Sequence, residues 1–386
     1  MLLAFPFFGK ANIIRKMVYK NILLFIFILI GVIPCSQAQN PSISQIDFEE
    51  VSRVVDAPLG SVWNLLPHVA VDSSNSIYVA DASNEIIVQM EQHDGTFVRE
   101  FGGEGQGPGK FGDISSMQVV GGDTLFISDD SNRRITYWPA EDESPDRVTR
   151  LEYTGSFDAA IRLTPNRIIT TDQMAYRADD AERDDDRQVV VALHGSDGAM
   201  EQDSVQTWET DEVVLSRERG IVFVGDHPFG RENKYAVHAE RFYRLWTGEP
   251  RVTIYDAALQ QVGQFALAHD APPVTSDDVD RAVDAIQEGG VIGDIYRSAL
   301  REVIPDTWPP VVSMFVDDQG YIWVGLRTPP DEPNRWVQCN ENGDIIAEGM
   351  LPNQVTLEAI RGNRAYGIAE DPEYGGPITV VYTIRD

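Results

Sequence analysis

Cysteine and basic residues are both scarce in this chain of 386 residues. Its two cysteines are Cys35 and Cys339. Since Cys35 falls in the leader described below, the rest of the chain cannot form an internal disulfide. The 31 Lys and Arg residues stand against 61 Asp and Glu residues, a formal net charge of −30. Nucleic acid and anionic membranes are therefore poor partners. We interpret the acidic excess as a solubilising coat, with an acidic docking surface as the alternative.

Long apolar runs are lacking after residue 38, so the sequence predicts no transmembrane segment in the mature chain. The run Ile22–Ile33 follows four basic residues and has the length of a signal-peptide core. A small-x-small cleavage site ends at Ala38. We therefore expect residues 1–38 to be a signal peptide and residues 39–386 to be exported, to the periplasm or the outside of the cell.

Two alternatives concern this leader. Met17 begins a complete signal of its own and could be the true start. Cys35 offers a site for a lipid anchor, but Pro34 stands where that signal needs a small residue. We expect the free protein rather than the lipidated one.

Short strand patterns begin at His68. Residues 68–102 contain four segments, HVAV, IYVAD, EIIVQM and TFVREFG, rich in the β-branched and aromatic residues that suit half-buried strands. Ser-Ser-Asn and Asp-Gly supply the turn chemistry between them. One such four-stranded sheet cannot bury both of its faces alone, so the pattern should recur.

The second of these segments does recur. Its anchor positions are Tyr78, Phe126, Ile169, Phe223, Trp323 and Tyr366, at intervals of 48, 43, 54, 100 and 43 residues. Repeats of this length with four strands each are typical of β-propeller blades. The sequence therefore predicts an all-β fold, a six-bladed β-propeller with four-stranded blades, over residues 39–386. In blade four we assign Phe223 to the second strand and 234–267 to the third and fourth strands.

The stretch VAVDSSNSIYVADASNEIIVQMEQHDGTFVREFG resembles the NHL repeat, and GGEGQGPGKF is similar to a connector of secreted bacterial six-bladed propellers. The segment DDQGYIWVGL resembles that family's fifth blade. The resemblance implies a propeller fold and an exported location, but no particular activity. The glycine-rich connector is not a phosphate loop, because Lys110 is not followed by Ser or Thr and no helix comes next. Its glycines instead suit sharp turns.

Two segments depart from the repeat. Ser44–Val55 alternates as a strand, and blade six has room for only three strands of its own, so we expect Ile46–Val55 to pair with Pro377–Ile384 and close the ring. Residues 276–304 have apolar residues at helical spacing, which predicts a small helical insertion between blades four and five.

Acidic residues end several second strands, among them Asp81, Asp129 and Asp226. One hypothesis is a ring of carboxylates at the channel mouth that binds a divalent cation such as calcium. The other is that each Asp caps the next turn through backbone N–H groups, which the Asp-x-x-Asn spacing favours. Arg327 stands at the corresponding place in blade five, where a guanidinium suits an anionic group.

Three further residues are candidate ligand-binding groups at this mouth. His68 lies on the predicted inner strand of blade one, and His227 and Arg231 are the first and last residues of the loop HPFGR. One histidine on the axis is a weak metal site, because zinc needs several converging ligands. We expect no bound cofactor, and metal content stays open.

We expect a monomeric, exported binding module whose partner is a small molecule, a glycan or a protein at the channel mouth. No local motif predicts a catalytic nucleophile. The alternative is a metal-dependent propeller hydrolase or lyase, similar to the lactonases or to strictosidine synthase.

Overall fold

The computed structural model describes residues 43–54, 68–91, 95–153, 157–173, 188–218, 221–286, 289–371 and 376–385. The chain divides into two units, residues 1–40 and 41–386, and every described residue belongs to the second. The predicted signal peptide therefore lies outside the described residues. No helix in the described part of the chain is long and apolar enough to span a bilayer.

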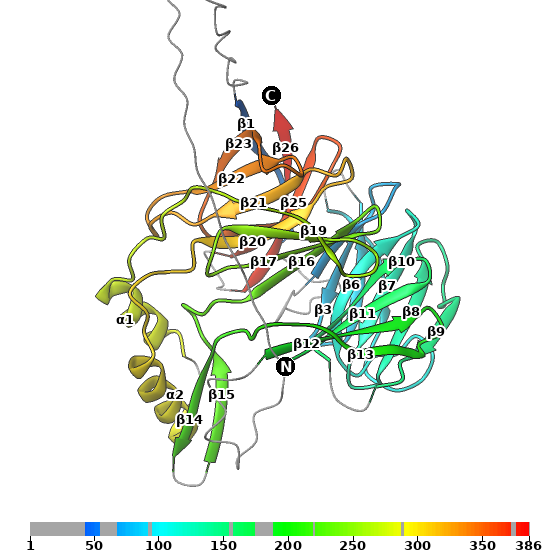
Figure 1. Cartoon of the computed structure of the whole chain (residues 1–386), viewed down its shortest axis with the longest axis horizontal. Helices are drawn as coiled ribbons and strands as arrows, with labels where there is room; N and C mark the ends of the chain where they lie inside the picture. The colour runs from blue at the N-terminus through cyan, green and yellow to red at the C-terminus, as the bar shows by residue number, and fades with distance from the viewer. Residues whose placement is uncertain are drawn as a thin grey trace, which may run out of the picture. The chain divides into compact units, whose positions relative to one another are not determined.

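Four antiparallel sheets have four strands each, in sequence order (Figure 1). The first contains β2 (His68–Val71), β3 (Ile77–Asp81), β4 (Ile86–Met90) and β5 (Phe97–Gly102). The second contains β6 (Ile114–Val120), β7 (Thr124–Asp129), β8 (Arg134–Pro139) and β9 (Arg147–Arg150). The third contains β10 (Ala159–Thr164), β11 (Arg167–Gln173), β12 (Gln188–Gly195) and β13 (Met200–Glu209). The fourth contains β16 (Asn233–His238), β17 (Arg241–Trp246), β18 (Arg251–Tyr255) and β19 (Gln261–Ala266). This propeller-like arrangement confirms the all-β prediction.

A buried aspartate shapes the first turn of the repeat. Oδ1 of Asp72 accepts hydrogen bonds from the backbone N–H groups of Ser74 and Ser76, both at 2.9 Å, and Oδ2 accepts one from the Tyr78 hydroxyl at 2.9 Å. Asp317 does the same with two backbone N–H groups and the indole N–H of Trp323 at 2.8 Å. The aspartate thus fixes the turn and ties it to the aromatic side chain of the second strand.

The remaining large sheet has eight strands and includes the N-terminal strand. Its order is β20 (Val311–Val316), β21 (Ile322–Leu326), β22 (Asn334–Cys339), β23 (Ile345–Leu351), β1 (Ser44–Val54), β26 (Pro377–Arg385), β25 (Arg364–Glu370) and β24 (Val355–Arg361). β1 runs antiparallel beside β26, with Asp47 opposite Arg385 and Val54 opposite Thr379 (Figure 1). The predicted pairing of the two ends is confirmed.

The sequence did not indicate the second partner of β1. Ser44, Gln45 and Ile46 pair in parallel with residues 347–349 of β23, so one strand joins two four-stranded groups. The close approach needs Gly349, because a Cβ there would lie 2.6 Å from the Phe48 ring. Phe48 also meets Trp323 and Tyr382 edge-on, with ring centroids 6.4 and 6.3 Å apart.

The assignment of blade four was wrong. Phe223 lies in a separate two-stranded sheet of β14 (Val213–Glu218) and β15 (Ile221–Asp226), outside the four-stranded sheets. The segment assigned to two long strands instead forms the whole sheet β16–β19. Its first turn places Ala239 and Glu240 at φ of 47° and 61°, in the left-handed region. Neither residue is a usual turn former there, so the sequence showed no break between β16 and β17.

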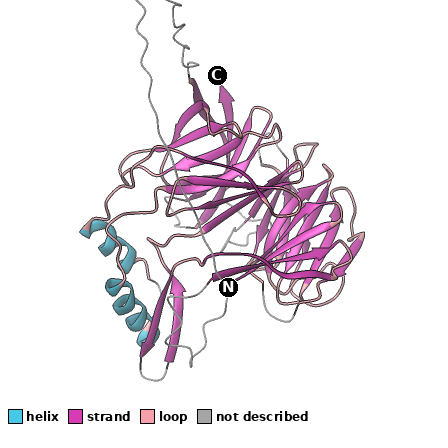
Figure 2. Cartoon of the chain, in the orientation of Figure 1, coloured by secondary structure: helices cyan, strands magenta, loops and turns pink. Residues whose placement is uncertain are grey.

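Helix is confined to the predicted insertion within the described residues (Figure 2). α1 (Ser276–Asp284) begins at a capping box in which Thr275 and Asp278 exchange hydrogen bonds. α2 (Gly290–Glu302) follows and packs on the β14–β15 hairpin. The two helices, the hairpin and the segments beside them share one apolar cluster that includes Val214, Phe229 and Leu300.

The glycine-rich connector after β5 is a clamped loop. Gly102, Gly103, Gly105 and Gly109 all have positive φ, which a side chain would disfavour. The guanidinium of Arg134 donates to the backbone carbonyls of Gln106 and Lys110 inside it. This arrangement confirms the structural interpretation of the glycines.

Candidate functional site

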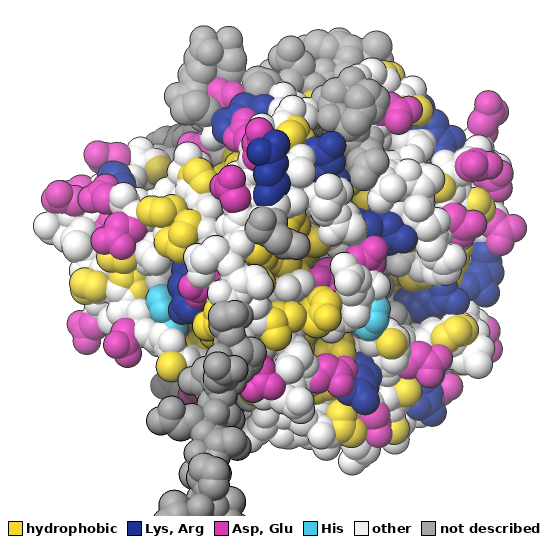
Figure 3. Space-filling view, turned by 90° about the horizontal axis from the view of Figure 1, so that it is seen from above, with side chains coloured by type: hydrophobic (Ala, Val, Ile, Leu, Met, Phe, Trp, Pro, Cys, Tyr) yellow, Lys and Arg dark blue, Asp and Glu magenta, His cyan; other side chains and the backbone are white. Residues whose placement is uncertain are grey.

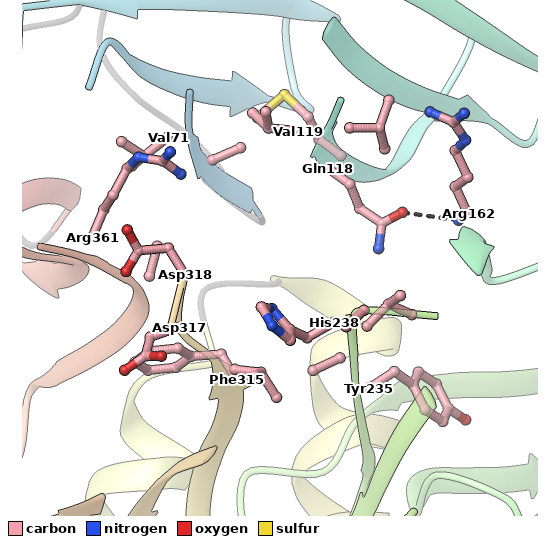
Figure 4. Close-up of a pocket in the computed structure, with 18 of the residues that line it drawn as sticks. Val71, Gln118, Val119, Arg162, Tyr235, His238, Phe315, Asp317, Asp318 and Arg361 are labelled. Atoms are coloured by element: carbon pink, nitrogen blue, oxygen red, sulfur yellow. Dashed lines mark hydrogen bonds between the residues drawn. The ribbon is translucent and has the colours of Figure 1, made fainter. Parts of the chain in front are cut away.

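The first strands of the sheets surround a cavity of about 540 Å³. It is lined by residues of β2, β6, β10, β16, β20 and β24, which are the strands that open each group of four. Figure 4 shows side chains from several of these strands facing the open space. Because every group contributes, this cavity is the channel expected from the propeller pattern.

The cavity lies toward the end of the channel opposite to the predicted site. Its lining runs to the last residues of the first strands, such as Val71, His238 and Arg361. In the antiparallel pair β2–β3, Val71 lies opposite Ile77 and His68 opposite Ala80. The strand ends that carry the predicted aspartates therefore lie beside the starts of the first strands, away from most of the cavity lining.

Polar side chains at the cavity rim carry both signs of charge. Arg162 and Arg361 come from β10 and β24, and Asp318 follows β20 (Figure 4). Oε1 of Gln118 accepts a hydrogen bond from the backbone N–H of Arg162 at 2.9 Å, which connects β6 to β10 at the cavity wall. The His238 ring projects into the open space (Figure 4). A polar ligand would find donors and acceptors on facing walls.

Glu358 lies deeper on the same cavity wall, in the middle of β24. Among the described residues its carboxylate has no hydrogen-bond partner, although it lies close enough to Lys234 for their charges to interact. The Lys234 ammonium is itself ion-paired with Glu232 at 2.8 Å. Burial raises the pKa of Glu358 to about 7, with Lys234 opposing the shift. Keeping this carboxylate charged at neutral pH therefore costs folding free energy. Such perturbed carboxylates are characteristic of functional positions.

This carboxylate should make stability depend on pH. Its pKa is raised from 4.5 in the unfolded chain to about 7, so its favourable contribution is complete below pH 4.5 and is lost as pH rises through 7. Glu358→Gln should therefore raise the free energy of unfolding at pH 8, by something on the order of 2 kcal/mol, and change it little at pH 4. Urea denaturation at both pH values measures the difference, and an equal effect at the two would contradict the assignment.

Asp81 and Asp129 are engaged in turns of the fold. Both are fully buried. Asp81 accepts from the backbone N–H groups of Ser83 and Asn84 and from the Asn84 side chain. Asp129 accepts from the side chain of Asn132 at 2.8 Å and is ion-paired with Arg134 at 3.0 Å. These contacts are those of the capping hypothesis, and a ligand role for either residue stays a prediction.

His68 lies at the start of β2, close to the second sheet. Its Nε2 lies 3.0 Å from the backbone carbonyl oxygen of Ser115. Burial lowers the pKa of His68 to about 4, so the ring is neutral at physiological pH. A neutral, hydrogen-bonded ring suits a packing role, and its binding role remains a prediction.

The other predicted residues gather around the helical insertion. Nε2 of His227 lies 3.2 Å from the carbonyl oxygen of Val303, just after α2. The Arg231 guanidinium is ion-paired with Glu212 at 3.1 Å. The backbone carbonyl of Asp226 accepts a hydrogen bond from the Tyr296 hydroxyl on α2. Asp226 belongs to the β14–β15 hairpin, so it is not the counterpart of Asp81 and Asp129.

Arg327 follows β21 and lines a second cavity, of about 360 Å³. Pro228, from the HPFGR loop, lines it as well, so two of the predicted regions do come together. The helix α1 and Trp308 also line this site, and the sequence did not indicate either of them as part of it.

In the described part of the chain, no group of three or more His, Cys, Asp or Glu side chains is placed to hold a metal ion. The acidic side chains of the surface are spread over the face in Figure 3, with Lys and Arg among them, and do not form one patch. The sequence signal that was missed lies elsewhere. Arg162 and Glu358 are charged residues inside mainly apolar first strands, AAIRLT and VTLEAIR, the second of which ends at Arg361.

No known protein family matches the chain, and no curated protein matches it by sequence. Solved structures do resemble it. A member of the DUF4221 family from Bacteroides vulgatus has a TM-score of 0.50 at 9% identity, over 88% of this chain and 98% of that one. This likeness extends over nearly the whole of both chains and supports a common fold.

Two further structures resemble the chain less closely. A Bacteroides fragilis protein, provisionally described as exported, has a TM-score of 0.46 at 13% identity, over 89% of this chain and 96% of that one. A luciferin-regenerating enzyme has a TM-score of 0.39 at 13% identity, over 88% and 95% of the two chains. At these identities a likeness concerns the fold alone.

Proposed function

We propose that this chain is an exported six-bladed β-propeller, with NHL-like repeats, that binds a small polar molecule in its channel. The two halves of the eight-stranded sheet, β20–β23 and β24–β26 with β1, count as blades five and six. Six apolar clusters support this count, because each joins one blade to the next. One of these clusters packs Val69 and Ile77 of the first sheet against Tyr366 and Val381 of blade six. The first and last blades are therefore in contact.

The observation that carries the binding function is the unpartnered carboxylate of Glu358 in the channel cavity. Glu358 is partly buried in surroundings that disfavour its charged form, and a ligand that donates to the carboxylate would recover that free energy. The donor is an ammonium, amide or hydroxyl group of the ligand. Arg361, at the end of the same strand, suits an acceptor or anionic group at the far end of the ligand.

Substitution of Glu358 separates binding from folding. A thermal-shift screen of amino acids, sugars and nucleosides against the mature protein should find ligands that stabilise it, and isothermal titration gives their affinities. Glu358→Gln should weaken such a ligand tenfold or more, because a charge-assisted hydrogen bond is lost, even though the variant is the more stable protein at pH 8.

A matched control is Glu341→Gln. Oε1 of Glu341 accepts a hydrogen bond from the Tyr243 hydroxyl at 2.9 Å, and Glu341 does not line the channel cavity. Its substitution should therefore leave ligand affinity unchanged. The proposal fails if the ligands that stabilise the protein bind Glu358→Gln as tightly as the unchanged chain.

The exported location rests on the leader sequence. Mass spectrometry of the secreted or periplasmic protein should find Gln39 as the first residue. A lipid-modified Cys35 would instead show the anchored form, and retention of residues 17–38 would contradict export by this signal.

The metal-dependent hydrolase or lyase remains the alternative from the sequence. The described residues offer no cluster of metal ligands in its favour. Metal analysis of the purified protein, followed by a screen of lactones and esters, tests it directly, and stoichiometric calcium or zinc together with turnover would replace the binding function.

A further inference from the structure

The helical insertion forms one wall of the 360 Å³ cavity beside Arg327. Arg281 and Ala282 of α1 face the segment that follows β21, which contributes Thr328 and Pro330. Trp308, Pro228, Pro330 and Ala282 give the cavity its apolar surface, and polar residues that include Asn334 and Asn353 line the rest. None of these residues lines the channel cavity, so the two cavities are separate sites.

Arg327 is held in place by its neighbours. Its backbone N–H donates to the carbonyl of Pro310 at 2.9 Å, and its own carbonyl oxygen lies 2.6 Å from Nε2 of His269. Its side-chain Nε donates to the carbonyl of Pro309 at 3.1 Å. The guanidinium carbon lies 4.9 Å from the centre of the Trp308 ring. These contacts orient the guanidinium before any ligand arrives.

The two terminal nitrogens of Arg327 have no hydrogen-bond or ion-pair partner among the described residues. Burial lowers the pKa of Arg327, and the charge of Glu232 opposes the shift. That carboxylate is ion-paired with Lys234 at 2.8 Å and does not neutralise Arg327. Arg327 is only partly buried, so its terminal nitrogens are open to a ligand from the cavity. In a chain with 61 acidic residues, the lack of a partner is a specific feature of this position.

The other charges of the cavity already have partners. Oδ2 of Asp278 accepts from the Thr275 hydroxyl at 2.8 Å and from the indole N–H of Trp308 at 3.3 Å. Its Oδ1 accepts from the Arg281 guanidinium at 2.5 Å. Burial alone would raise the pKa of Asp278, but the hydrogen bonds from the Thr275 backbone N–H, the Thr275 hydroxyl and Trp308, together with the Arg281 charge, outweigh it and lower the pKa. Asp278 and Arg281 neutralise each other, so Arg327 gives the cavity one net positive charge.

Trp308 is the fixed wall of this cavity. Its backbone N–H donates to the carbonyl of Pro272 at 2.9 Å, and its ring meets Phe229 edge-on with centroids 4.6 Å apart. The insertion is closed at its base by the bridge between Pro273 and Thr307. The wall is therefore anchored to the domain on both sides of the helices.

We propose that this cavity binds the carboxylate of a small organic acid, with Arg327 as the recognition group and Trp308 beside the apolar body of the ligand. The planar guanidinium presents two terminal nitrogens in the geometry that a carboxylate accepts. A single net charge within a chain of net charge −30 favours a monoanion over a dianion such as phosphate, since the surrounding acids repel the second charge.

Isothermal titration of the mature protein with sodium benzoate tests the proposal. Benzoate combines a carboxylate with an apolar ring, and benzamide is its neutral counterpart. We expect saturable binding of benzoate at one site, at least tenfold weaker binding of benzamide, and weaker binding of inorganic phosphate. Arg327→Met should lower the affinity for benzoate tenfold or more, and Arg327→Lys should also weaken it because a single ammonium cannot replace the fork.

Two controls distinguish this site from the channel and from a structural role. Glu358→Gln should bind benzoate as the unchanged chain does, so a failure of the channel proposal would not affect this one. Arg327→Met should keep its melting temperature within about 3 °C, because the lost contacts are offset by the removal of a partly buried charge. The proposal is overturned if benzoate does not bind, if benzamide or phosphate binds as tightly, or if Arg327→Met mainly destabilises the fold.

Discussion

Removal of residues 39–54 should abolish the cooperative unfolding transition of the whole β-domain. The deletion takes away β1, the strand that pairs with both β23 and β26. It also removes Ile46 and Phe48 from the apolar cluster of the eight-stranded sheet. Since domains are stable by only about 5–15 kcal/mol, the loss of a whole strand and its packing exceeds what the rest can tolerate. Thermal denaturation, monitored by circular dichroism, shows whether the cooperative unfolding transition is lost.

A milder change tests the same strand without removing it. Phe48→Ala should lower the free energy of unfolding by about 2–4 kcal/mol, because the ring packs against Trp323 and Tyr382. Glu49→Gln is the control, since Glu49 makes only an exposed ion pair with Arg385 and should change stability by less than about 1 kcal/mol. A synthetic peptide of residues 43–54 should restore the transition of the deletion variant. An unchanged melting temperature after the deletion would contradict the role of β1.

Arg134→Met should cost the domain about 3–5 kcal/mol of unfolding free energy. The change leaves Asp129 fully buried without its ion-pair partner at 3.0 Å. It also frees the connector after β5, where Arg134 donates to the carbonyls of Gln106 and Lys110. Urea denaturation measures the loss.

A surface pair provides the comparison. Arg251→Met removes an exposed ion pair with Glu249 at 3.1 Å and should cost no more than about 1 kcal/mol. Combining Arg134→Met with Asp129→Asn should recover part of the loss, because the two residues are coupled. If Arg134→Met were as mild as the surface variant, Asp129 would not depend on its partner, and a ligand role for this aspartate would regain support.

Local patterns predicted the parts of the fold that rest on local physics. The spacing of Asp81 and Asn84 indicated a capped turn, and the hydrogen bonds of Asp81 are those of such a turn. The alternation in residues 44–55 indicated a strand, and the missing strand of the last repeat indicated its partner. Both inferences use only residues a few positions apart or the count of strands in a repeat.

Tertiary context decided what the patterns missed. The segment around Phe223 reads as a blade strand, but it packs on the helical insertion instead. The break between β16 and β17 depends on Ala239 and Glu240, which both adopt the left-handed conformation although neither residue type favours it. Likewise, among the described residues the Glu358 carboxylate and the terminal nitrogens of Arg327 lack hydrogen-bond partners. Which side chains lie near them depends on the tertiary fold, so no single-sequence pattern contains this information.

The position of β1 has a consequence for the order of folding. Among the described strands, β1 is synthesised first and its antiparallel partner β26 last. The eight-stranded sheet therefore cannot be completed before β26 has been synthesised. Such a long-range closure is entropically slow. The export proposed above would suit this order, because β1 stays without its partner β26 until the last described strand has been synthesised.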